Sequence, residues 1–284
     1  MGIKTVLSLA QAQAIFPKRD FITLEATLRG VIDTTYVVSN QTQSFILKKY
    51  ERATSIQIQQ EQQLLKKLSK VSLQVPYPLE SSQQWHLFTL IKGDIPHKIT
   101  VQQLRSVGRF LGKLHSHTIN QKSTFTPFKR ENYQKTVKNL RKSNFYYAKQ
   151  LSYLQYFPTE VDGIIHGDLF CDNSKFDGSI LGVFDFIEAG NGSFAFDLGV
   201  VAMSWIGKKR LSRLQINILL QAYNQNINKK ITLKKLLKMM HVAALVYTLK
   251  RLTNPLSPLD HQEMLLVSQK IQHFTKSTFR RKKC

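Results

Sequence analysis

The hydrophobic and polar positions in the first part of the chain follow the pattern of a small sheet. Residues 28–39 and 44–50 are rich in β-branched and aromatic side chains, and the polar residues 40–43 between them indicate a hairpin turn. Residues 85–91 have a similar strand-like composition. We therefore expect three strands in this part, the first two of them joined directly.

One helix interrupts the strand pattern. Over residues 54–69 the apolar side chains recur on one side at helical spacing, and Thr54 or Ser55 is available as the N-cap. The two prolines within residues 75–78 then favour an extended chain, which ends the helical segment.

The pattern changes after a connector that contains Gly93 and Pro96. Long helical periodicities predict helices over residues 101–117, 132–156, 213–225, 233–252 and 260–274. Residues 164–197 differ from them, with short strand-like runs and turns that contain glycine and aspartate. The sequence thus predicts an α+β, bilobal chain with a small β-rich lobe over residues 1–91 and a larger, mainly helical lobe over residues 92–284.

Composition excludes several classes of protein. The chain has 284 residues, of which 42% are hydrophobic, so it can bury a core and is not disordered as its main state. Its longest apolar runs, residues 180–184 and 194–205, fall short of the ~18 residues that cross a bilayer. The first six residues show no export signal. With only Cys171 and Cys284, no disulfide framework is available, and we expect a cytoplasmic protein without a membrane partner.

The charge is strongly positive. The chain has 41 Lys and Arg against 18 Asp and Glu, a net charge of +23, and residues 198–259 include no acidic residue. Such a field attracts anions, which include nucleic acid, acidic membrane surfaces and phosphate-bearing ligands. The basic residues are dispersed along helical patterns and form no basic and aromatic motif. This favours a solvated basic face over a nucleic-acid site; the oligomeric state stays open.

The densest group of potential catalytic residues lies between residues 164 and 186. Asp168 is followed five positions later by Asn173, and Asp185 stands twelve positions beyond that, at the end of an apolar strand. Phosphoryl transfer from Mg-ATP needs such a set, because one carboxylate deprotonates a hydroxyl while an amide oxygen and a second carboxylate hold Mg²⁺. We assign Asp168 as the base and Asn173 and Asp185 as magnesium ligands. Each alone could be a turn residue; the ordered set favours catalysis.

This segment resembles the aminoglycoside phosphotransferase and choline kinase superfamily, which is related to the protein kinases. The run 166–168 (His-Gly-Asp), Asn173 and the run 185–186 (Asp-Phe) match the superfamily pattern, although Ile187 stands where protein kinases have glycine. Residues 164–205 look most like the homoserine kinases of this fold. The resemblance implies a protein-kinase-like fold and an ATP- and Mg²⁺-dependent phosphotransferase, most similar to one that phosphorylates homoserine.

The resemblance also implies roles in the first lobe. Alternation along the strand 44–50 places Ile46 and Lys48 on one face, where relatives have an apolar contact with adenine and a lysine that binds phosphates. Lys49 points to the other face and is the alternative. Glu61 matches the helical position from which relatives pair a carboxylate with that lysine, although a solvated helical glutamate is a competing interpretation.

Two further segments of the first lobe match nucleotide-binding positions of the superfamily. Residues 29–36 correspond to the loop over the phosphates; because this loop has one glycine, Thr34 and Thr35 would supply backbone and hydroxyl donors. Thr89 to Ile91 correspond to the hinge whose backbone groups bind the edge of adenine.

Other residues are expected to support the catalytic loop. The resemblance implies that His166 braces the loop and that the Asp197 carboxylate accepts hydrogen bonds from the backbone around His166. His115 is expected to be architectural, and Cys171 to be a filler within the loop.

The acceptor site is less well defined by the sequence. A zwitterion such as homoserine needs a cation for its carboxylate, for which Arg251 is a candidate, and an acidic group for its ammonium. Glu188, with Tyr247 and Trp205, could instead surround choline, and the two aromatic residues are otherwise expected in the core or pocket wall. An aminoglycoside is disfavoured, because residues 198–284 include only two acidic residues.

The expected reaction is direct transfer of the γ-phosphoryl group to a hydroxyl, without a covalent enzyme intermediate. Two alternatives stay open. One is a kinase of choline, ethanolamine or, less favoured, an aminoglycoside. The other is a catalytically silent kinase-like protein that binds an anionic partner through its basic helices. The complete set of Asp168, Asn173 and Asp185 disfavours the silent protein, because a scaffold has no chemical need for it.

Overall fold

The computed structural model describes the chain as two compact units. The described residues are 4–27, 33–207, 211–254 and 260–280. Unit 1 comprises residues 1–93 and 182–187, and unit 2 comprises residues 94–181 and 188–284. The segment 182–187, which begins within the strand Ile180–Val183 and includes Asp185, thus groups with the first part of the chain and not with its sequence neighbours.

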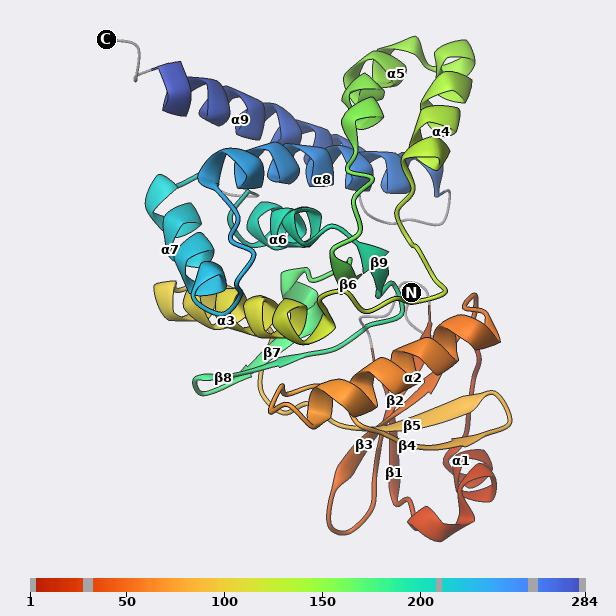
Figure 1. Cartoon of the computed structure of the whole chain (residues 1–284). Helices are drawn as coiled ribbons and strands as arrows, with labels where there is room; N and C mark the ends of the chain where they lie inside the picture. The colour runs from red at the N-terminus through yellow and green to blue at the C-terminus, as the bar shows by residue number, and fades with distance from the viewer. Residues whose placement is uncertain (1–3, 28–32, 208–210, 255–259, 281–284) are drawn as a thin grey trace. The chain divides into compact units, whose positions relative to one another are not determined.

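Unit 1 is built on a five-stranded antiparallel sheet in the order β1-β2-β3-β5-β4 (Figure 1). The strands are β1 Thr23–Ala26, β2 Thr34–Ser39, β3 Ser44–Lys49, β4 Pro78–Ser82 and β5 Trp85–Thr89. Between β2 and β3 the Asn40 side chain accepts hydrogen bonds from the backbone N–H groups of Thr42 and Gln43, each at 3.0 Å. This local bonding closes the predicted hairpin turn.

One face of the sheet forms the core of unit 1. Tyr36 and Val38 of β2 and Leu47 of β3 project to this face and are almost completely buried. The short helix α1 (Leu9–Ile15) is part of the same core, in which Ala12 is fully buried. Burial of this apolar face is the main source of stability for the sheet.

Helix α2 (Ser55–Ser69) lies along the opposite face of the sheet (Figure 1). Its N-cap is Thr54, one of the two candidates in the sequence, and Thr54 forms a capping box. Gln62 of α2 is hydrogen-bonded to His86 of β5 at 3.0 Å. Lys48 pairs with His86 across β3 and β5, so it shares the face that α2 covers.

Unit 2 is mainly helical. Its α-helices are α3 Val101–Thr118, α4 Arg130–Ser143, α5 Phe145–Leu151, α6 Phe194–Ala202, α7 Arg213–Asn224, α8 Leu233–Thr253 and α9 His261–Arg280. Strand β6 (Gly163–Ile165) pairs with β9 (Gly190–Gly192), and β7 (Ser174–Asp177) pairs with β8 (Ile180–Val183). The predicted α+β class, with a β-rich first part and a mainly helical remainder, is confirmed.

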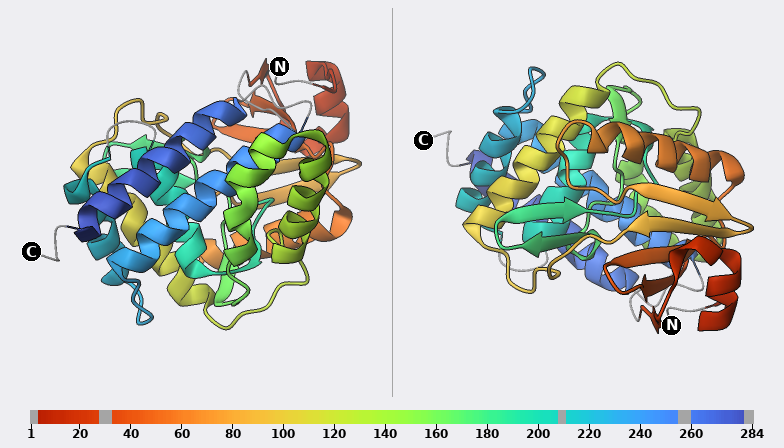
Figure 2. Two further views of the ribbon diagram at one scale, coloured as in Figure 1. Left: turned by 90° about the horizontal axis from the view of Figure 1, so that it is seen from above. Right: turned by 90° about the horizontal axis from the view of Figure 1, so that it is seen from below.

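Helix α8 lies at the centre of unit 2, packed against α6 and α9 (Figures 1 and 2). Every residue of α6 is buried, and α8 has buried residues on nearly every side. α6 continues into a π-helical turn, Met203–Gly207. Despite the burial of these two helices, none of the helices in the described ranges is both long and apolar enough to cross a membrane.

The structure differs from the expected elements in several places. The helix predicted over residues 132–156 is broken at Asn144, whose backbone leaves the helical conformation (φ −149°, ψ 82°) and whose side chain caps α5 by accepting from the Tyr147 N–H. Helix α6 was not predicted, because its complete burial removes the periodic contrast on which sequence analysis depends. Helix α1 and strand β1 are short and were also missed. Residues 28–32 of the expected first strand lie outside the described residues.

We predict that Gly112→Val destabilises unit 2. A Cβ at Gly112 would lie 2.7 Å from the Tyr223 carbonyl oxygen of α7, so a side chain there forces α3 and α7 apart. The expected loss in the free energy of unfolding is about 3 kcal/mol, measured by urea denaturation. Lys113→Val is the control: this exposed neighbour should change stability by less than about 0.5 kcal/mol. Equal stability of the two variants would contradict the close packing of α3 and α7.

Candidate functional site

The alternation of β3 gives Lys48 and Lys49 different surroundings. In the register of β2, β3 and β5, Ile46 and Lys48 share one face, as predicted, and Lys49 lies on the other. The Lys49 ammonium donates to the Thr5 hydroxyl at 3.0 Å, on the side of the N-terminal segment. Lys48 is therefore the lysine that joins the acidic cluster described next.

Lys48 is buried and paired with two carboxylates. Its Nζ lies 3.1 Å from an oxygen of Asp33 and 3.0 Å from an oxygen of Asp185, and its side chain is 13% exposed. Burial alone lowers the pKa of Lys48, but the charges of Asp185, Glu61 and Asp33 outweigh it and raise the pKa well above its usual value. Lys48 is thus a fixed positive charge. Asp33 was not singled out from the sequence, because only the fold brings it to Lys48.

Glu61 of α2 is buried rather than solvated. One of its oxygens accepts from the Tyr50 hydroxyl and the other from the Phe186 N–H at 2.9 Å. The expected direct ion pair with Lys48 is not formed: within the described residues, the ion pairs of Lys48 join it to Asp33 and Asp185. Burial raises the pKa of Glu61, against the opposing effect of the Lys48 charge. Glu61 therefore anchors the backbone next to Asp185.

Asp185 follows β8 in a strained conformation. Its φ of 64° lies in the left-handed region, which non-glycine residues seldom adopt. The Glu61 bond to the Phe186 N–H holds the adjoining peptide, and Lys48 holds the Asp185 carboxylate. The Asp185 side chain is 39% exposed, so the fold keeps an acidic group at an accessible position in unit 1.

Thr34 and Thr35 occupy different faces of β2. Thr35 is directly opposite Lys48 in the β2–β3 register and so lies on the same face. Thr34 is fully buried, and its hydroxyl donates to Glu51 at 2.6 Å while it accepts from the Thr5 N–H. The structure thus gives the Thr34 hydroxyl a structural partner, whereas Thr35 has the placement expected of a phosphate-side residue.

Thr89 and Ile91 lie at the end of β5 and just after it. The Thr89 N–H donates to the Tyr77 carbonyl oxygen at 3.0 Å, and its hydroxyl accepts from the Tyr77 N–H at 2.8 Å. The Thr89 backbone donor is therefore used within the sheet. Ile91 packs against the backbone of Gly182, where an added Cβ would lie 2.3 Å from the Ile91 side chain.

In unit 2, the buried carboxylate of Asp197 organises the loop that carries Asp168. Its Oδ2 accepts from His115 Nε2 at 3.0 Å and from the His166 N–H at 2.8 Å, and its Oδ1 accepts from the Gly167 N–H at 2.9 Å. Burial raises the pKa of Asp197, but the hydrogen bond and charge of His115, the charge of His166 and the Gly167 N–H lower it on balance. These contacts match those expected for Asp197 from the resemblance.

His166 and Gly167 shape the loop itself. His166 is fully buried, and its Nδ1 accepts from the Asp168 N–H at 3.2 Å, so the imidazole braces the loop. Gly167 has a φ of 82°, and an added Cβ would lie 2.8 Å from the Phe128 ring. Both the backbone conformation and the space therefore require glycine before Asp168.

The Asp168 carboxylate is held on both sides. Tyr247 of α8 places its hydroxyl 2.8 Å from Asp168 Oδ1 and 2.5 Å from the Gly167 carbonyl oxygen. The Asn173 amide nitrogen lies 2.7 Å from the Asp168 carbonyl oxygen and 3.3 Å from Asp168 Oδ2. The structure thus brings together the predicted base and Asn173, whose amide oxygen is the atom that would ligate a metal.

Tyr247 has a contact with Asp168 that the sequence did not reveal. We expected it in the core or pocket wall, and it is indeed buried, but its hydroxyl contacts Asp168. Burial, followed by the charge and hydrogen bond of Asp168, raises the pKa of Tyr247 well above its usual value. Tyr247 is therefore a hydrogen-bond donor to the carboxylate. Trp205 stabilises the same loop through its Nε1–H, which donates to the Leu169 carbonyl oxygen at 3.2 Å.

Arg251 does not belong to this cluster. Its side chain is 7% exposed and donates to the Asp260 carbonyl oxygen at 3.1 Å and to the Glu263 carboxylate at 3.3 Å. Arg251 thus joins the end of α8 to the start of α9, and its expected role toward a substrate carboxylate is corrected on this ground. The neighbouring Lys250 points elsewhere: its Nζ lies 3.2 Å from an oxygen of Glu188.

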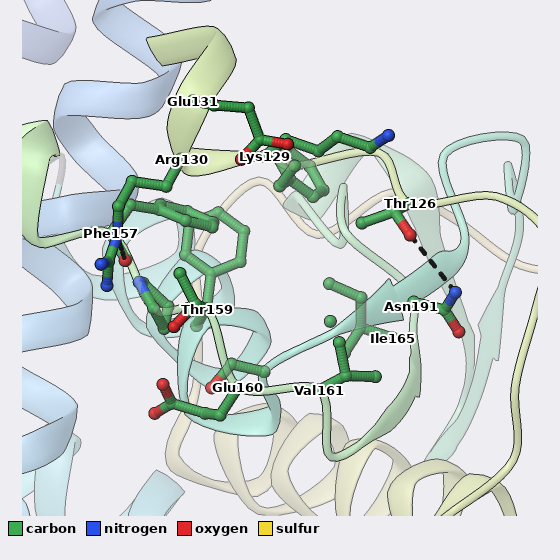
Figure 3. A pocket seen from close by; sticks show the side chains of 15 residues that line it. Thr126, Lys129, Arg130, Glu131, Phe157, Thr159, Glu160, Val161, Ile165 and Asn191 are labelled. Atoms are coloured by element: carbon green, nitrogen blue, oxygen red, sulfur yellow. Dashed lines mark hydrogen bonds between the residues drawn. The ribbon is translucent and has the colours of Figure 1, made fainter. Parts of the chain in front are cut away.

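A separate pocket of unit 2 lies beside β6 and β9 (Figure 3). Its lining includes Thr126, Arg130, Phe157 and Asn191, and Thr126 and Asn191 are hydrogen-bonded at 3.2 Å (Figure 3). None of the expected site residues lines this pocket. Across the described ranges, no group of three or more His, Cys, Asp and Glu side chains forms a metal site by itself. The catalytic interpretation therefore depends on the loop around Asp168.

We predict that Asp197→Asn destabilises the protein by about 3 kcal/mol at pH 7, because it leaves a buried hydrogen-bond network without its charge. The pKa of Asp197 is lowered in the folded state, so its contribution is complete well above the ordinary value of 3.8 and is lost as the pH falls through the lowered pKa. Urea unfolding from pH 7 downward should show the difference between the variant and the wild type shrinking at acidic pH.

The exposed Asp177 of β7 supplies the control for this measurement. Asp177→Asn should leave stability within about 0.5 kcal/mol of the wild type at each pH. A loss for Asp197→Asn that is no larger than this, or that grows toward low pH, would contradict the anchoring role of Asp197.

Comparison with known proteins assigns this chain to a family. A model of the phosphotransferase enzyme family matches residues 23–229. Homoserine kinase from Methylobacillus glycogenes is 22% identical over 228 residues, which cover 72% of this chain and 71% of that protein. This family match confirms the prediction of an enzyme that transfers phosphoryl groups.

Solved structures share the fold. An aminopropanol kinase associated with a microcompartment aligns with a TM-score of 0.65 at 15% identity, covering 96% of this chain and 98% of the other. An amicoumacin kinase in complex with AMP-PNP, Ca²⁺ and Ami aligns with a TM-score of 0.63 at 16% identity, covering 89% of each chain. At these identities the likeness concerns the fold, and it confirms the expected kinase-like fold class. The matched residues include the sheet of unit 1 and the Asp168 loop, and the chain belongs to the phosphotransferase enzyme family.

Proposed function

We propose that the protein is a small-molecule kinase that transfers the γ-phosphoryl group of ATP, bound with Mg²⁺, to the side-chain hydroxyl of homoserine. The single observation that supports this most is the Asp168 carboxylate, which Tyr247 and Asn173 hold on opposite sides. A carboxylate fixed in this way is suited to receive a hydroxyl proton. Homoserine as the acceptor is supported by the homoserine kinase relatives.

In this proposal Asp168 orients the acceptor hydroxyl and accepts its proton as the oxygen bonds to phosphorus and the bond to the leaving phosphate breaks. Tyr247 and Asn173 keep the carboxylate in one orientation, and His166 and Asp197 fix the backbone that carries it. No covalent enzyme intermediate is needed. The contribution of these residues is positioning and electrostatic stabilisation.

The nucleotide would be held mainly by residues 1–91, and the acceptor by the helical part of the chain. Lys48, a buried and permanent cation, would bind phosphate oxygens, with Thr35 on the same face. Ile46 would contact the base, and the backbone of residues 89–91 its edge.

Asp185 and Asn173 offer the carboxylate and amide oxygens that Mg²⁺ prefers, so their donor chemistry fits this ion. When bound, Mg-ATP supplies the transferable phosphoryl group with its charge partly neutralised. Glu61 would act indirectly, by holding the peptide next to Asp185.

The silent binding protein is the weaker alternative. A protein that only binds an anion needs no buried network around Asp168, yet Asp197, His115 and His166 are all committed to that loop. Maintaining a buried carboxylate costs free energy, which a catalytic role explains better than a scaffold role.

We predict that Asp168→Asn lowers homoserine-dependent ADP release by about 100-fold or more, because the proton acceptor is lost. Binding of a nucleotide analogue should change little, since Asp168 is assigned to the acceptor side. Asp185→Ala should abolish Mg²⁺-dependent nucleotide binding as well as turnover. Wild-type turnover by Asp168→Asn would exclude Asp168 as the base, and absence of homoserine-dependent turnover in the wild type would exclude homoserine.

We predict that Tyr247→Phe lowers kcat by roughly tenfold, because one hydrogen bond to the charged carboxylate is lost. The KM for ATP should stay within about twofold, since Tyr247 is not assigned to the nucleotide. Tyr36→Phe is the matched control: its buried hydroxyl is bonded to the backbone of Leu7 and Thr5, away from Asp168. If kcat of Tyr247→Phe equals that of Tyr36→Phe, Tyr247 has no positioning role.

A further inference from the structure

The helical unit contains an ion pair with unusual surroundings, formed by Lys250 of α8 and Glu188, which precedes β9. We propose that this pair is the recognition site for the acceptor, with Lys250 binding an α-carboxylate and Glu188 binding an α-ammonium group. The acceptor class is then a small hydroxy-amino acid. This inference rests on the proposed function and deepens it by naming the residues that bind the two charged groups of the substrate.

The first observation is the accessibility of both charged groups. Lys250 Nζ lies 3.2 Å from Glu188 Oε2, and the two side chains are 37% and 33% exposed. An ion pair in contact with solvent contributes little to stability, because water screens the attraction between the two charges. A ligand that offers one carboxylate and one ammonium group can therefore replace the pair at little cost and satisfy both charges again.

The second observation is the proximity of this pair to the base. The Lys250 Nζ lies 5.5 Å from the ring centre of Tyr247, and the hydroxyl of that same ring contacts Asp168. The backbone of Glu188 also lies close to this loop. Its carbonyl oxygen would be 3.0 Å from a Cβ added to Gly167, the residue before Asp168. Both charged residues thus border the peptide that carries the base, within reach of a small molecule.

The third observation is that aromatic rings hold the Lys250 cation in place. Its Nζ lies 4.9 Å from the ring centre of Phe128 in addition to its contact with Tyr247. Cation–π contacts of this kind position an ammonium group without using its hydrogen-bond donors. Those donors can then serve a carboxylate. The nearby Arg251 is excluded from this role, because it is buried against α9 through Asp260 and Glu263.

Charge balance also indicates the acceptor class. The pair is neutral as a whole although the chain carries a net charge of +23. A polycation such as an aminoglycoside would place like charge against Lys250, and a simple amino alcohol would leave Lys250 without a ligand partner. A zwitterion satisfies both groups.

Three acceptors of matched length test the proposal: homoserine, 3-aminopropan-1-ol, which lacks the carboxylate, and 4-hydroxybutanoate, which lacks the ammonium group. For Lys250→Met, kcat/KM for homoserine should fall by about tenfold or more, while that for 3-aminopropan-1-ol should change by less than about twofold. For Glu188→Gln, the same loss of preference should appear between homoserine and 4-hydroxybutanoate. The KM for ATP should stay within about twofold in both variants.

The controls use a second ion pair of the same unit. Lys235, also on α8, lies 2.8 Å from Glu160, with side chains 41% and 47% exposed. Lys235→Met and Glu160→Gln should leave the preference for homoserine unchanged. Because each preference is a ratio of two acceptors measured on one preparation, it does not depend on the fraction of correctly folded enzyme.

Two failures are distinguishable. If the wild type phosphorylates homoserine but Lys250→Met and Glu188→Gln keep its preferences, the Lys250–Glu188 assignment is overturned and the proposed function stands. If the wild type shows no homoserine-dependent ADP release, the proposed function is overturned and the assignment falls with it.

Discussion

The loop that carries Asp168 depends on the hydrogen bonds accepted by the buried carboxylate of Asp197. A buried charge is costly unless it is fully hydrogen-bonded, and this one is satisfied by His115 and by the backbone N–H groups of His166 and Gly167. Two of these donors belong to the loop before Asp168. The requirement to satisfy the Asp197 charge therefore fixes the backbone that carries Asp168, the proposed base, and α3 and α6 supply the rigid support.

Unit 1 also contains a buried charge that needs partners, and this charge is positive. The buried ammonium of Lys48 is compensated by Asp33 and Asp185, while Glu61 anchors the peptide after Asp185 through the Phe186 N–H. The strained backbone of Asp185 persists because contacts on both sides determine it. In both units, burial of a charge is used to hold a neighbouring polar group in one orientation.

Helix α8 connects core packing with chemistry. Helix α8 is packed between α6 and α9, which fixes its position along its length. The side chains near its end are therefore also held in fixed positions. Tyr247 presents its hydroxyl to Asp168, Lys250 presents its ammonium to Glu188, and Arg251 bonds to the start of α9. Neighbouring residues thus serve different purposes because successive positions of a helix face different directions.

The sequence by itself determined the α+β class, the shared face of Ile46 and Lys48, the start of α2 near Thr54 and Ser55, and the order of Asp168, Asn173 and Asp185, because these depend on local periodicity and spacing. The tertiary structure decided the partners: Tyr247 for Asp168, Tyr50 rather than Lys48 for Glu61, Lys250 for Glu188 and Glu263 for Arg251. The reason is physical. A helix that is buried on nearly every side, such as α8, has no amphipathic stripe in its sequence to show which direction each residue faces.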